Sequence, residues 1–403
     1  MDTAVINLDQ LKVELRAVLN ENILGYWLRH SLDEKHGGFI GHINSDNSKE
    51  YRANKNIILN TRLLWTFSHA YRQNQNQEYL DLANRAYQYI FQYFRDEEHG
   101  GVYWELDYSG KALKMYKHIY AQAFVIYSLT EYYMATKRKE ALSWAIEIFK
   151  LIEKYSRDTK RGGYIEAFRN DWSGLDDFRL SEKDPNEKKT MNTHLHLMEA
   201  YTNLIRISPD ASVKEAQISL VNLFFDKFLD DAYHLKLFFN EHWNLKSDIV
   251  SFGHDIEAAW LLCEATNVLG DIDLQDKAKN AALKITDTCI EEGMDKDGGI
   301  INERSGNSGE LDTNRHWWQQ AEAMVALMNA WQISGNDKYL ISLNKLWKFI
   351  KKNIIDHEQG EWYWKVDQDG NPFPEDEKAG AWKCSYHNSR ACIELINRIE
   401  KHR

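Results

Sequence analysis

The sequence contains little proline and no long uncharged apolar segment. Only 4 of its 403 residues are proline, about 1% against a typical ~5%, so helices can run uninterrupted and a proline-rich linker is excluded. No apolar segment reaches the ~18 residues of a membrane-spanning helix. The formal charge is −11 and there is no basic stripe. We therefore expect neither a membrane nor a nucleic acid as partner.

Cysteine is also scarce, and the N-terminus lacks the features of a signal peptide. Cys263, Cys289, Cys384 and Cys392 form no CxxC pair, and we expect reduced, mostly buried thiols. The N-terminal stretch MDTAVINLDQLKVELRAVL has acidic residues where a signal peptide has basic ones. These observations predict a cytoplasmic protein. No pattern in the sequence indicates an oligomer, so we expect a monomer.

What the sequence does contain is a sixfold repeat. A glycine turn with alternating residues recurs as HGGFIGHI from 36, HGGVYWEL from 99, RGGYIEAF from 161, DGGIINE from 297 and QGEWYWKV from 359, and a degenerate copy, YHLKLFFNEHW, begins at 233. Each copy alternates like a short strand and leads into polar turn residues, the pattern of a β-hairpin.

Each copy is followed by a strongly apolar stretch and then a charged amphipathic one. Stretches such as NIILNTRLLWTFSHAYR indicate helices buried on both sides, and those such as EALSWAIEIFKLIEKYS indicate helices with one wet face. Six such pairs predict an all-α fold, an (α/α)6 barrel of twelve helices with short β-hairpins at the active-site mouth. An open solenoid would need polar terminal copies, which are lacking here. We therefore expect residues 1–403 to form one closed catalytic domain.

Aligning the apolar stretches places a polar residue at one position of each copy. Because residues three apart share a helix face, histidines three positions earlier should line the same barrel end, which is the predicted active mouth. The polar residues are Arg62, Gln122, Glu199, Glu257, Glu322 and Arg390, and the histidines are His196, His254 and His387.

Three histidines at one repeat position favour a catalytic role over the structural role that a single histidine usually has. Asn192 shares the face of His196, whereas His194 lies about 200° around the helix and should point away. Glu257 could set the tautomer of His254. The ring of carboxylates and guanidinium groups could equally serve only to tie helices together.

Tryptophans at the heads of the apolar stretches could stack against sugar rings, whose C–H faces are apolar. Trp317 and Trp318 are adjacent, so both cannot point the same way, and Trp382 is the third candidate. Hairpin tryptophans at 104, 243 and 362 could extend this platform. A zinc site built from the histidines and Glu257 is the rival interpretation, but HxxE is a weak motif. No phosphate loop or GxSxG elbow occurs.

Along nearly its whole length the chain resembles the cellobiose 2-epimerases, which belong with the N-acylglucosamine 2-epimerases and aldose–ketose isomerases that share an (α/α)6 barrel. The resemblance is carried by HGGFIGHI, NIILNTRLLWTFSHAYR, YAQAFVIYSL, MNTHLHLMEAYTNL, GHDIEAAWLL, RHWWQQAEA and AWKCSYHNSRACIE. It implies reversible C2 epimerisation of the reducing-end sugar of a β-1,4-linked disaccharide: cellobiose to glucosyl-mannose, lactose to epilactose, or mannobiose to mannosyl-glucose.

The resemblance also implies roles for individual residues, and it implies no cofactor and no metal. His254 and His387 match the acid/base pair, and His196 matches a third essential histidine. The sugar-contacting positions are matched by Arg62, Tyr120, Asp184, Asn192, Glu257, one of Trp317 and Trp318, and Trp382.

The chemistry of the residues agrees with this reaction. C2 epimerisation requires ring opening, loss of the C2 proton to give an enediol, and return of a proton to the other face. Imidazole, with an unperturbed pKa near 6.5, can accept and donate protons near neutrality. Two histidines could serve opposite faces, or one could act twice while the intermediate rotates about C2–C3. Arg62 and His196 are candidates to hold the enediolate oxygen.

Three other functions fit parts of the pattern. The same site could serve an aldose–ketose isomerase or a monosaccharide or N-acylglucosamine 2-epimerase. A glycosidase could use two carboxylates among Asp184, Glu257 and Glu322, but the repeated histidines would then be superfluous. A non-catalytic sugar-binding protein would tolerate loss of all three histidines.

Overall fold

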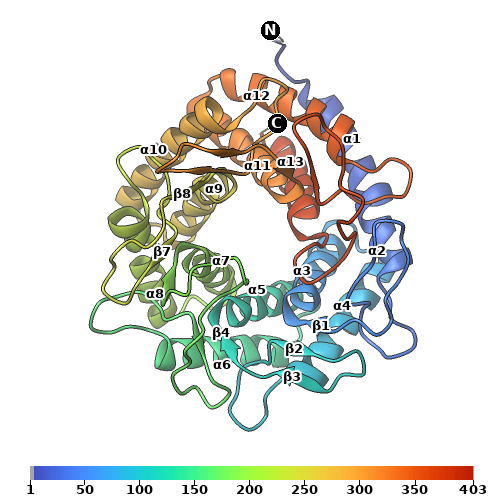
Figure 1. The fold of residues 1–403 in the computed structure, drawn as a ribbon, viewed down its shortest axis with the longest axis vertical. Coiled ribbons are helices and arrows are strands. Elements are labelled where there is room, and N and C mark those ends of the chain that lie inside the picture. The colour runs from blue at the N-terminus through green and yellow to red at the C-terminus, as the bar shows by residue number, and fades with distance from the viewer. Residues whose placement is uncertain (1–3, 403) are drawn as a thin grey trace.

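A computed structural model describes residues 4–402, so residues 1–3 and 403 of the expected domain lie outside the described residues. The expected (α/α)6 barrel is confirmed: Figure 1 shows an inner ring of helices surrounded by an outer ring. The inner ring consists of α3 (Ile57–Asn74), α5 (Ile119–Thr136), α7 (Met191–Ile207), α9 (Phe252–Leu269), α11 (Trp317–Ser334) and α13 (Tyr386–Lys401). The outer ring consists of α4 (Gln77–Tyr89), α6 (Lys139–Tyr155), α8 (Ala211–Leu223), α10 (Ile272–Thr288), α12 (Lys338–Phe349) and a first member made of α1 (Leu8–Ala17), the π-helical η1 (Val18–Leu24) and α2 (Gly25–His30).

The two rings bury their residues in different patterns. In α5 every residue from 119 to 132 is buried, because α3 and α7 flank it and α6 covers its outer side. The outer helix α6 instead buries one stripe, Ala141, Trp144, Ala145, Ile148, Phe149 and Ile152, with the spacing of an amphipathic helix. Among the described helices, none is long and apolar enough to cross a membrane.

Each inner helix passes to its outer partner through a tight turn. Gln75, Lys137, Gly270 and Gly335 adopt left-handed backbone angles directly after α3, α5, α9 and α11, which ends a helix within one residue. Four outer helices continue into π-helical turns: η2 (Ile90–Phe94), η3 (Phe224–Phe228), η4 (Cys289–Gly293) and η5 (Ile350–Ile354).

Short antiparallel strands join neighbouring repeats at the hairpin end. The strand before an inner helix pairs with the hairpin of the following repeat: β1 (Lys55–Asn56) with β2 (Glu105–Leu106), β4 (Lys117–His118) with β5 (Ala167–Phe168), β6 (Lys189–Thr190) with β7 (Phe238–Phe239), β8 (Ile249–Ser251) with β9 (Glu303–Ser305), and β11 (Arg315–His316) with β12 (Lys365–Val366). Two hairpins gain a further strand, β3 (Ala112–Lys114) on β2 and β10 (Leu311–Asp312) on β9. The last repeat pairs with the first through Ile43 and Ala379, so the ring is closed, as expected, and is not an open solenoid.

Buried ion pairs fix the start of the inner helices. Lys55 Nζ lies 2.8 Å from Asp33 Oδ2, and the same contact, from the strand before an inner helix to the end of the outer helix, recurs elsewhere. Replacing one partner of such a buried pair leaves a charge without compensation. Comparable pairs are Lys117–Asp96, Lys189–Asp158, Arg315–Asp295, whose carboxylate is partly exposed, and Lys378–Asp356, in which the lysine lies in the loop before α13.

Candidate active site

The first turns of the inner helices and the loops above them enclose a cavity of about 290 Å³ at the hairpin end of the barrel. Eleven of the residues predicted from the sequence line it: His196, His254, His387, Arg62, Tyr120, Asp184, Asn192, Glu257, Trp317, Trp318 and Trp382. The other members of the predicted polar ring, Gln122, Glu199, Glu322 and Arg390, do not line it. The sequence reasoning missed four further lining residues, Leu180, Ser181, His316 and Trp364.

Two of the three histidines are held by carboxylates. His196 Nδ1 lies 2.9 Å from Glu199 Oε2, and His387 Nδ1 lies 2.6 Å from Glu322 Oε1. Because a carboxylate only accepts hydrogen bonds, we assign the imidazole proton to Nδ1 in both rings. Nε2 is then the nitrogen that can accept a proton from a substrate.

The third histidine has a different partner from the one expected. His254 Nδ1 contacts Ser251 Oγ at 2.9 Å, and Glu257 does not set its tautomer. Glu257 Oε1 instead accepts a hydrogen bond from Arg390 Nη2 at 2.9 Å, a charge-assisted contact stronger than a bond to a neutral imidazole. Burial, together with His196, lowers the pKa of His254 to about 3.

Arg390 on α13 binds three buried carboxylates beneath the cavity. Its Nη1 donates to Glu199, and its Nη2 donates to Glu257 and to Glu322 Oε1, the latter at 2.7 Å. Burial would raise the pKa of Glu199, but Arg390 and His196 lower it to about 2. Burial and the nearby Glu322 raise the pKa of Glu257 well above its ordinary value.

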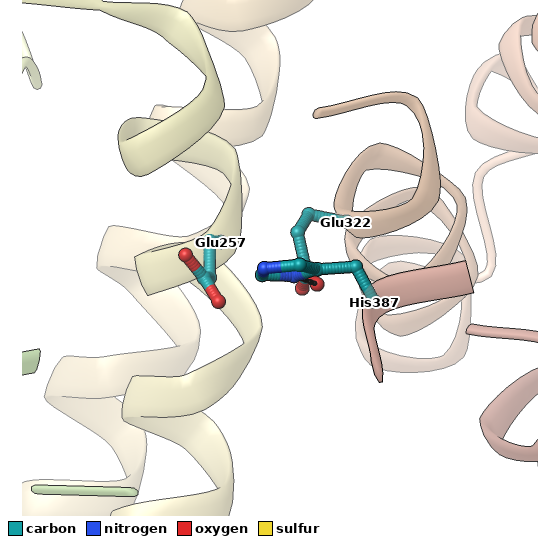
Figure 2. Close-up of side chains that lie close together, drawn as sticks. All are labelled: Glu257, Glu322 and His387. Carbon is teal, nitrogen blue, oxygen red and sulfur yellow. Dashed lines mark hydrogen bonds and ion pairs between the residues drawn. The ribbon is translucent and has the colours of Figure 1, made fainter. Parts of the chain in front are cut away.

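This arrangement bears on the predicted alternative of a metal site. Glu257, Glu322 and His387 point toward one another from α9, α11 and α13 in Figure 2, with possible ligand atoms within 4.8 Å of one another. Arg390 Nη2 already binds both glutamates, and His387 Nδ1 binds Glu322. The guanidinium group therefore neutralises negative charge that these carboxylates would otherwise offer to a metal cation.

Arg62 is held in place from several sides. Its Nη2 donates to Tyr120 Oη at 2.8 Å, its Nη1 donates to the Trp382 carbonyl oxygen at 3.3 Å, and its guanidinium carbon lies 4.6 Å from the ring centre of Phe124. Arg62 is only 3% exposed. Such a fixed, charged fork is suited to hydroxyl groups and to a developing oxyanion.

Both adjacent tryptophans reach the cavity, although their side chains diverge as expected. Trp318 packs near His254 and His387, with ring-centre distances of 5.1 and 5.7 Å. Trp317 lies 5.1 Å from Trp364 and 6.3 Å from His387. Trp317 and Trp318, whose side chains leave α11 about 100° apart, thus both lie near His387.

The hairpin tryptophans do not extend this platform. Trp104 lies against Trp382, at 6.2 Å between ring centres, and does not line the cavity. Trp243 packs on Phe228 and Phe239, and Trp362 is fully buried. In the hairpin QGEWYWKV the residue that reaches the cavity is Trp364, two positions after the buried Trp362.

The proposed register of the inner helices was wrong at two positions. Seven residues after the paired strand residues Lys55, Lys117 and Lys189 stand Arg62, Phe124 and His196, so Phe124 and not Gln122 occupies the matched position. Gln122 exchanges hydrogen bonds with the Val102 backbone. Glu199 lies one turn further along α7 than the matched position. The three histidines therefore do not share one repeat position: His196 is the sixth residue of α7, whereas His254 is the third of α9 and His387 the second of α13. The sequence alignment slipped because α5 and α7 begin at different distances from the apolar run.

A second cavity, of about 590 Å³, continues outward from the first. Its outer lining is polar, and it shares with the inner cavity Leu180, Ser181, Asp184, Asn192, His254, His316 and Trp318. Burial raises the pKa of Asp184, which lies in the long loop before β6. The further polar lining residues are Lys183, Asn302, Glu303, Asp312, Asn314 and Lys365.

Known proteins with related sequences and structures share this barrel over nearly the whole chain. A cellobiose 2-epimerase from Bacteroides fragilis is 46% identical over 96% of this chain and 98% of its own length. One from Ruminococcus albus is 42% identical over 96% of this chain and 98% of its own length. The solved cellobiose 2-epimerase from Bacillus thermoamylovorans superposes with a TM-score of 0.93 at 40% identity, covering 97% of this chain and 100% of that one.

These relationships define an enzyme of the isomerase class, a carbohydrate epimerase. The model of the N-acylglucosamine 2-epimerase family matches residues 38–391, and the chain belongs to that family.

Proposed function

We propose that this protein reversibly epimerises C2 of the reducing-end sugar of a β-1,4-linked disaccharide, without a cofactor or metal. The observation that carries the proposal is the placement of His254 and His387 near one indole, that of Trp318, with ring-centre distances of 5.1 and 5.7 Å. Both histidines line one cavity, so two bases can reach one substrate carbon. Burial lowers the pKa of both imidazoles, which keeps them neutral and able to accept a proton at pH 7.

The proposed reaction moves one proton at a time. His387 assists ring opening by transferring the C1 hydroxyl proton to the ring oxygen, which yields the open-chain aldehyde. One of His254 and His387 then removes the C2 proton, and the electron pair of the C2–H bond forms the enediolate. If one histidine acts twice, the imidazolium that holds the C2 proton returns it to the opposite face after the intermediate rotates about C2–C3. If two histidines act, the second enters this step as an imidazolium, and proton exchange with water then restores both starting forms. Ring closure by the reverse of the opening step completes the exchange.

The negative charge of the intermediate requires a fixed donor. Arg62, held by Tyr120 and the Trp382 carbonyl group, is placed to bind the enediolate oxygen in our proposal, together with His196. Preorganised donors that meet a developing charge are usually the largest single contribution to such catalysis. Trp317, Trp318 and Trp382 would stack on the sugar rings, and Asn192 and Glu257 would bind hydroxyl groups.

A disaccharide rather than a monosaccharide is supported by the second cavity. The inner cavity would hold the reacting sugar, and the outer cavity, with Asp184 at the junction, would hold the second sugar. The names of the related enzymes point to cellobiose. Lactose and mannobiose share the β-1,4 linkage and are proposed as further substrates.

The experiment is incubation of the protein with cellobiose in D2O. We expect glucosyl-mannose to form and deuterium to appear at C2 of both disaccharides. Formation of a ketose would favour the aldose–ketose isomerase, and release of glucose would favour a glycosidase. Turnover of mannose or N-acetylglucosamine but not of cellobiose would favour a monosaccharide epimerase. The absence of both product and exchange would refute the proposal.

A further inference from the structure

The carboxylates that hold His196 and His387 meet at one guanidinium group. His196 Nδ1 contacts Glu199 Oε2 at 2.9 Å, and Glu199 Oε1 binds Arg390 Nη1. On the other side Arg390 Nη2 contacts Glu322 Oε1 at 2.7 Å, and the same oxygen lies 2.6 Å from His387 Nδ1. A continuous chain of polar contacts therefore joins two histidines on α7 and α13.

Arg390 itself is placed beneath the site and not in it. The residue is 1% exposed and does not line the inner cavity. Tyr386, one turn earlier on α13, packs against its guanidinium and donates from Oη to Glu199 Oε1 at 2.6 Å. The aromatic ring and three carboxylates thus enclose the guanidinium, and Arg390 has no access to a substrate.

The planar shape of the guanidinium group fixes the relative positions of the carboxylates that it binds, in addition to neutralising their charge. Its two terminal nitrogens lie in one rigid plane, so carboxylates bound to them have a fixed separation, which an ammonium group does not impose. Glu199 and Glu322 transmit that separation to the two imidazoles.

We infer that Arg390 is a positioning residue that fixes His196 and His387 relative to one another, so that both imidazoles meet one substrate. This inference rests on the proposed function, because it assigns Arg390 a part in that reaction. Arg390 acts through Glu199 and Glu322 and does not touch the reacting atoms.

Arg390 also influences the charge state of the histidines. Burial, then Arg62 and Arg390, lower the pKa of His387. For His196, burial, Arg62 and Arg390 lower the pKa, and Glu199 opposes them. The other charged or titratable groups facing these rings are Tyr120, His254, Glu257, Glu322 and Tyr386.

The test compares Arg390→Lys and Arg390→Met with the same two changes at Arg398. Arg398 lies two turns later on α13 and binds Glu264, Gln332 and Asn329, none of which contacts a site histidine. For both Arg390 variants we expect kcat on cellobiose to fall by about 100-fold, the effect of a small misplacement of reacting groups, with little change in KM. The Arg398 variants should keep the wild-type kcat.

The pH profile separates positioning from mere structural support. Arg390→Met removes a positive charge, so the pKa of His387 and His196 should rise and the acid limb of kcat/KM should move to higher pH. Arg390→Lys retains the charge, so its acid limb should stay near that of the wild type while kcat falls. An Arg390→Met enzyme with the kcat and acid limb of Arg398→Met would overturn the inference.

Two measurements keep the inference testable if an Arg390 variant does not fold or if the reaction is another one. Tyr386→Phe removes one hydrogen-bond donor to Glu199 and retains the aromatic ring. We expect this variant to lose less kcat than the Arg390 variants and to show an altered His196 titration by NMR. An unchanged kcat and an unchanged titration would overturn the inference. The NMR titration of His196 and His387 needs no turnover. Failure of wild-type turnover would therefore sink the proposed function alone, and the titration in Arg390→Met would still decide whether Arg390 controls the histidines.

Discussion

His387 Nδ1 lies 2.6 Å from Glu322 Oε1 on the neighbouring helix α11. This contact fixes the imidazole tautomer, because an acceptor at Nδ1 leaves Nε2 unprotonated. The same glutamate accepts further hydrogen bonds, at Oε1 from Arg390 Nη2 and at Oε2 from Trp260 Nε1 at 2.9 Å, so its orientation is fixed independently of His387.

Glu322→Gln should therefore reduce kcat far more than it changes KM. The amide can turn its NH2 group toward Nδ1 and stabilise the wrong tautomer, a change that costs on the order of 10³-fold or more in comparable carboxylate–histidine pairs. Steady-state kinetics on cellobiose will measure the effect. Glu264→Gln, at the far end of α9 where Glu264 binds Arg206, is the matched control and should leave kcat unchanged. Equal kinetics for the two variants would contradict the assignment.

If His254 and His387 share the proton transfers at C2, His254→Ala and His387→Ala should each abolish epimerisation, and isotope exchange will show which transfer each histidine performs. If each histidine serves one face of C2, the enzyme with a single remaining histidine exchanges deuterium into one epimer without forming the other. If one histidine acts twice, one variant loses both activities and the other keeps epimerisation. NMR in D2O, started separately from cellobiose and from glucosyl-mannose, will distinguish these results.

The activity should persist well below the usual titration range of histidine. His254 has a pKa of about 3, because burial and His196 disfavour its charged form, and the pKa of His387 is lowered mainly by burial. A base is active when neutral, so its activity is lost as pH falls through its pKa. We expect the acid limb of kcat/KM to lie below the ordinary ~6.5. A half-maximal rate at or above pH 6.5 would contradict the neutral, buried histidines.

The fold could be predicted from the sequence because its signals are local and repeated six times. The glycine turns indicate hairpins, and the distribution of apolar residues indicates whether a helix is buried on both sides or on one. Six copies of this pattern predict a closed barrel. The site depended on contacts that only the closed ring creates. Glu257 was expected to orient His254, but Arg390, 133 residues later, attracts that carboxylate. The spacing of residues within one helix cannot show that a distant arginine binds this carboxylate.

Two other differences have equally physical causes. Strand alternation does not identify Trp364, because it would place Trp364 on the face of Trp362, which belongs to the core, whereas the backbone bends at Trp364 before β12 begins. Asp184 was found only through the family resemblance, since an irregular loop has no period that would show where its side chains lie. Gln122 was misplaced because the helix starts, and not the apolar runs, set the register.

Trp382→Ala should raise KM for cellobiose and change kcat less. Trp382 lines the inner cavity and contacts Tyr120, and loss of an aromatic contact of about 0.5–1.5 kcal/mol corresponds to a few-fold to roughly tenfold weaker binding. Trp243→Ala is the comparison, because Trp243 packs on Phe228 and Phe239 away from the cavity. It should lower Tm with KM unchanged. A raised KM in Trp243→Ala, with a normal KM in Trp382→Ala, would reverse the assignment of the two tryptophans.

Lys378→Ala should destabilise the protein through the charge that it leaves behind. Lys378 Nζ contacts Asp356 Oδ2 at 2.5 Å and donates to the Gly360 carbonyl oxygen at 2.9 Å, in the repeat that closes the ring. Removing one partner of a buried pair costs about 3–5 kcal/mol of unfolding free energy, and urea unfolding will measure it. Lys279→Ala breaks the exposed pair with Asp276 and should cost less than about 1 kcal/mol.

The contribution of the Lys378–Asp356 pair should also depend on pH. Burial raises the pKa of Asp356, but Lys378 outweighs it, so the pKa of the folded state is lowered. In the wild type the stabilisation by this pair is therefore present above the unfolded pKa near 3.9 and is lost as pH falls through the lower folded pKa. The stability difference between wild type and Lys378→Ala should therefore shrink below about pH 4, whereas a pH-independent difference would show that lost packing, and not the ion pair, carries the effect.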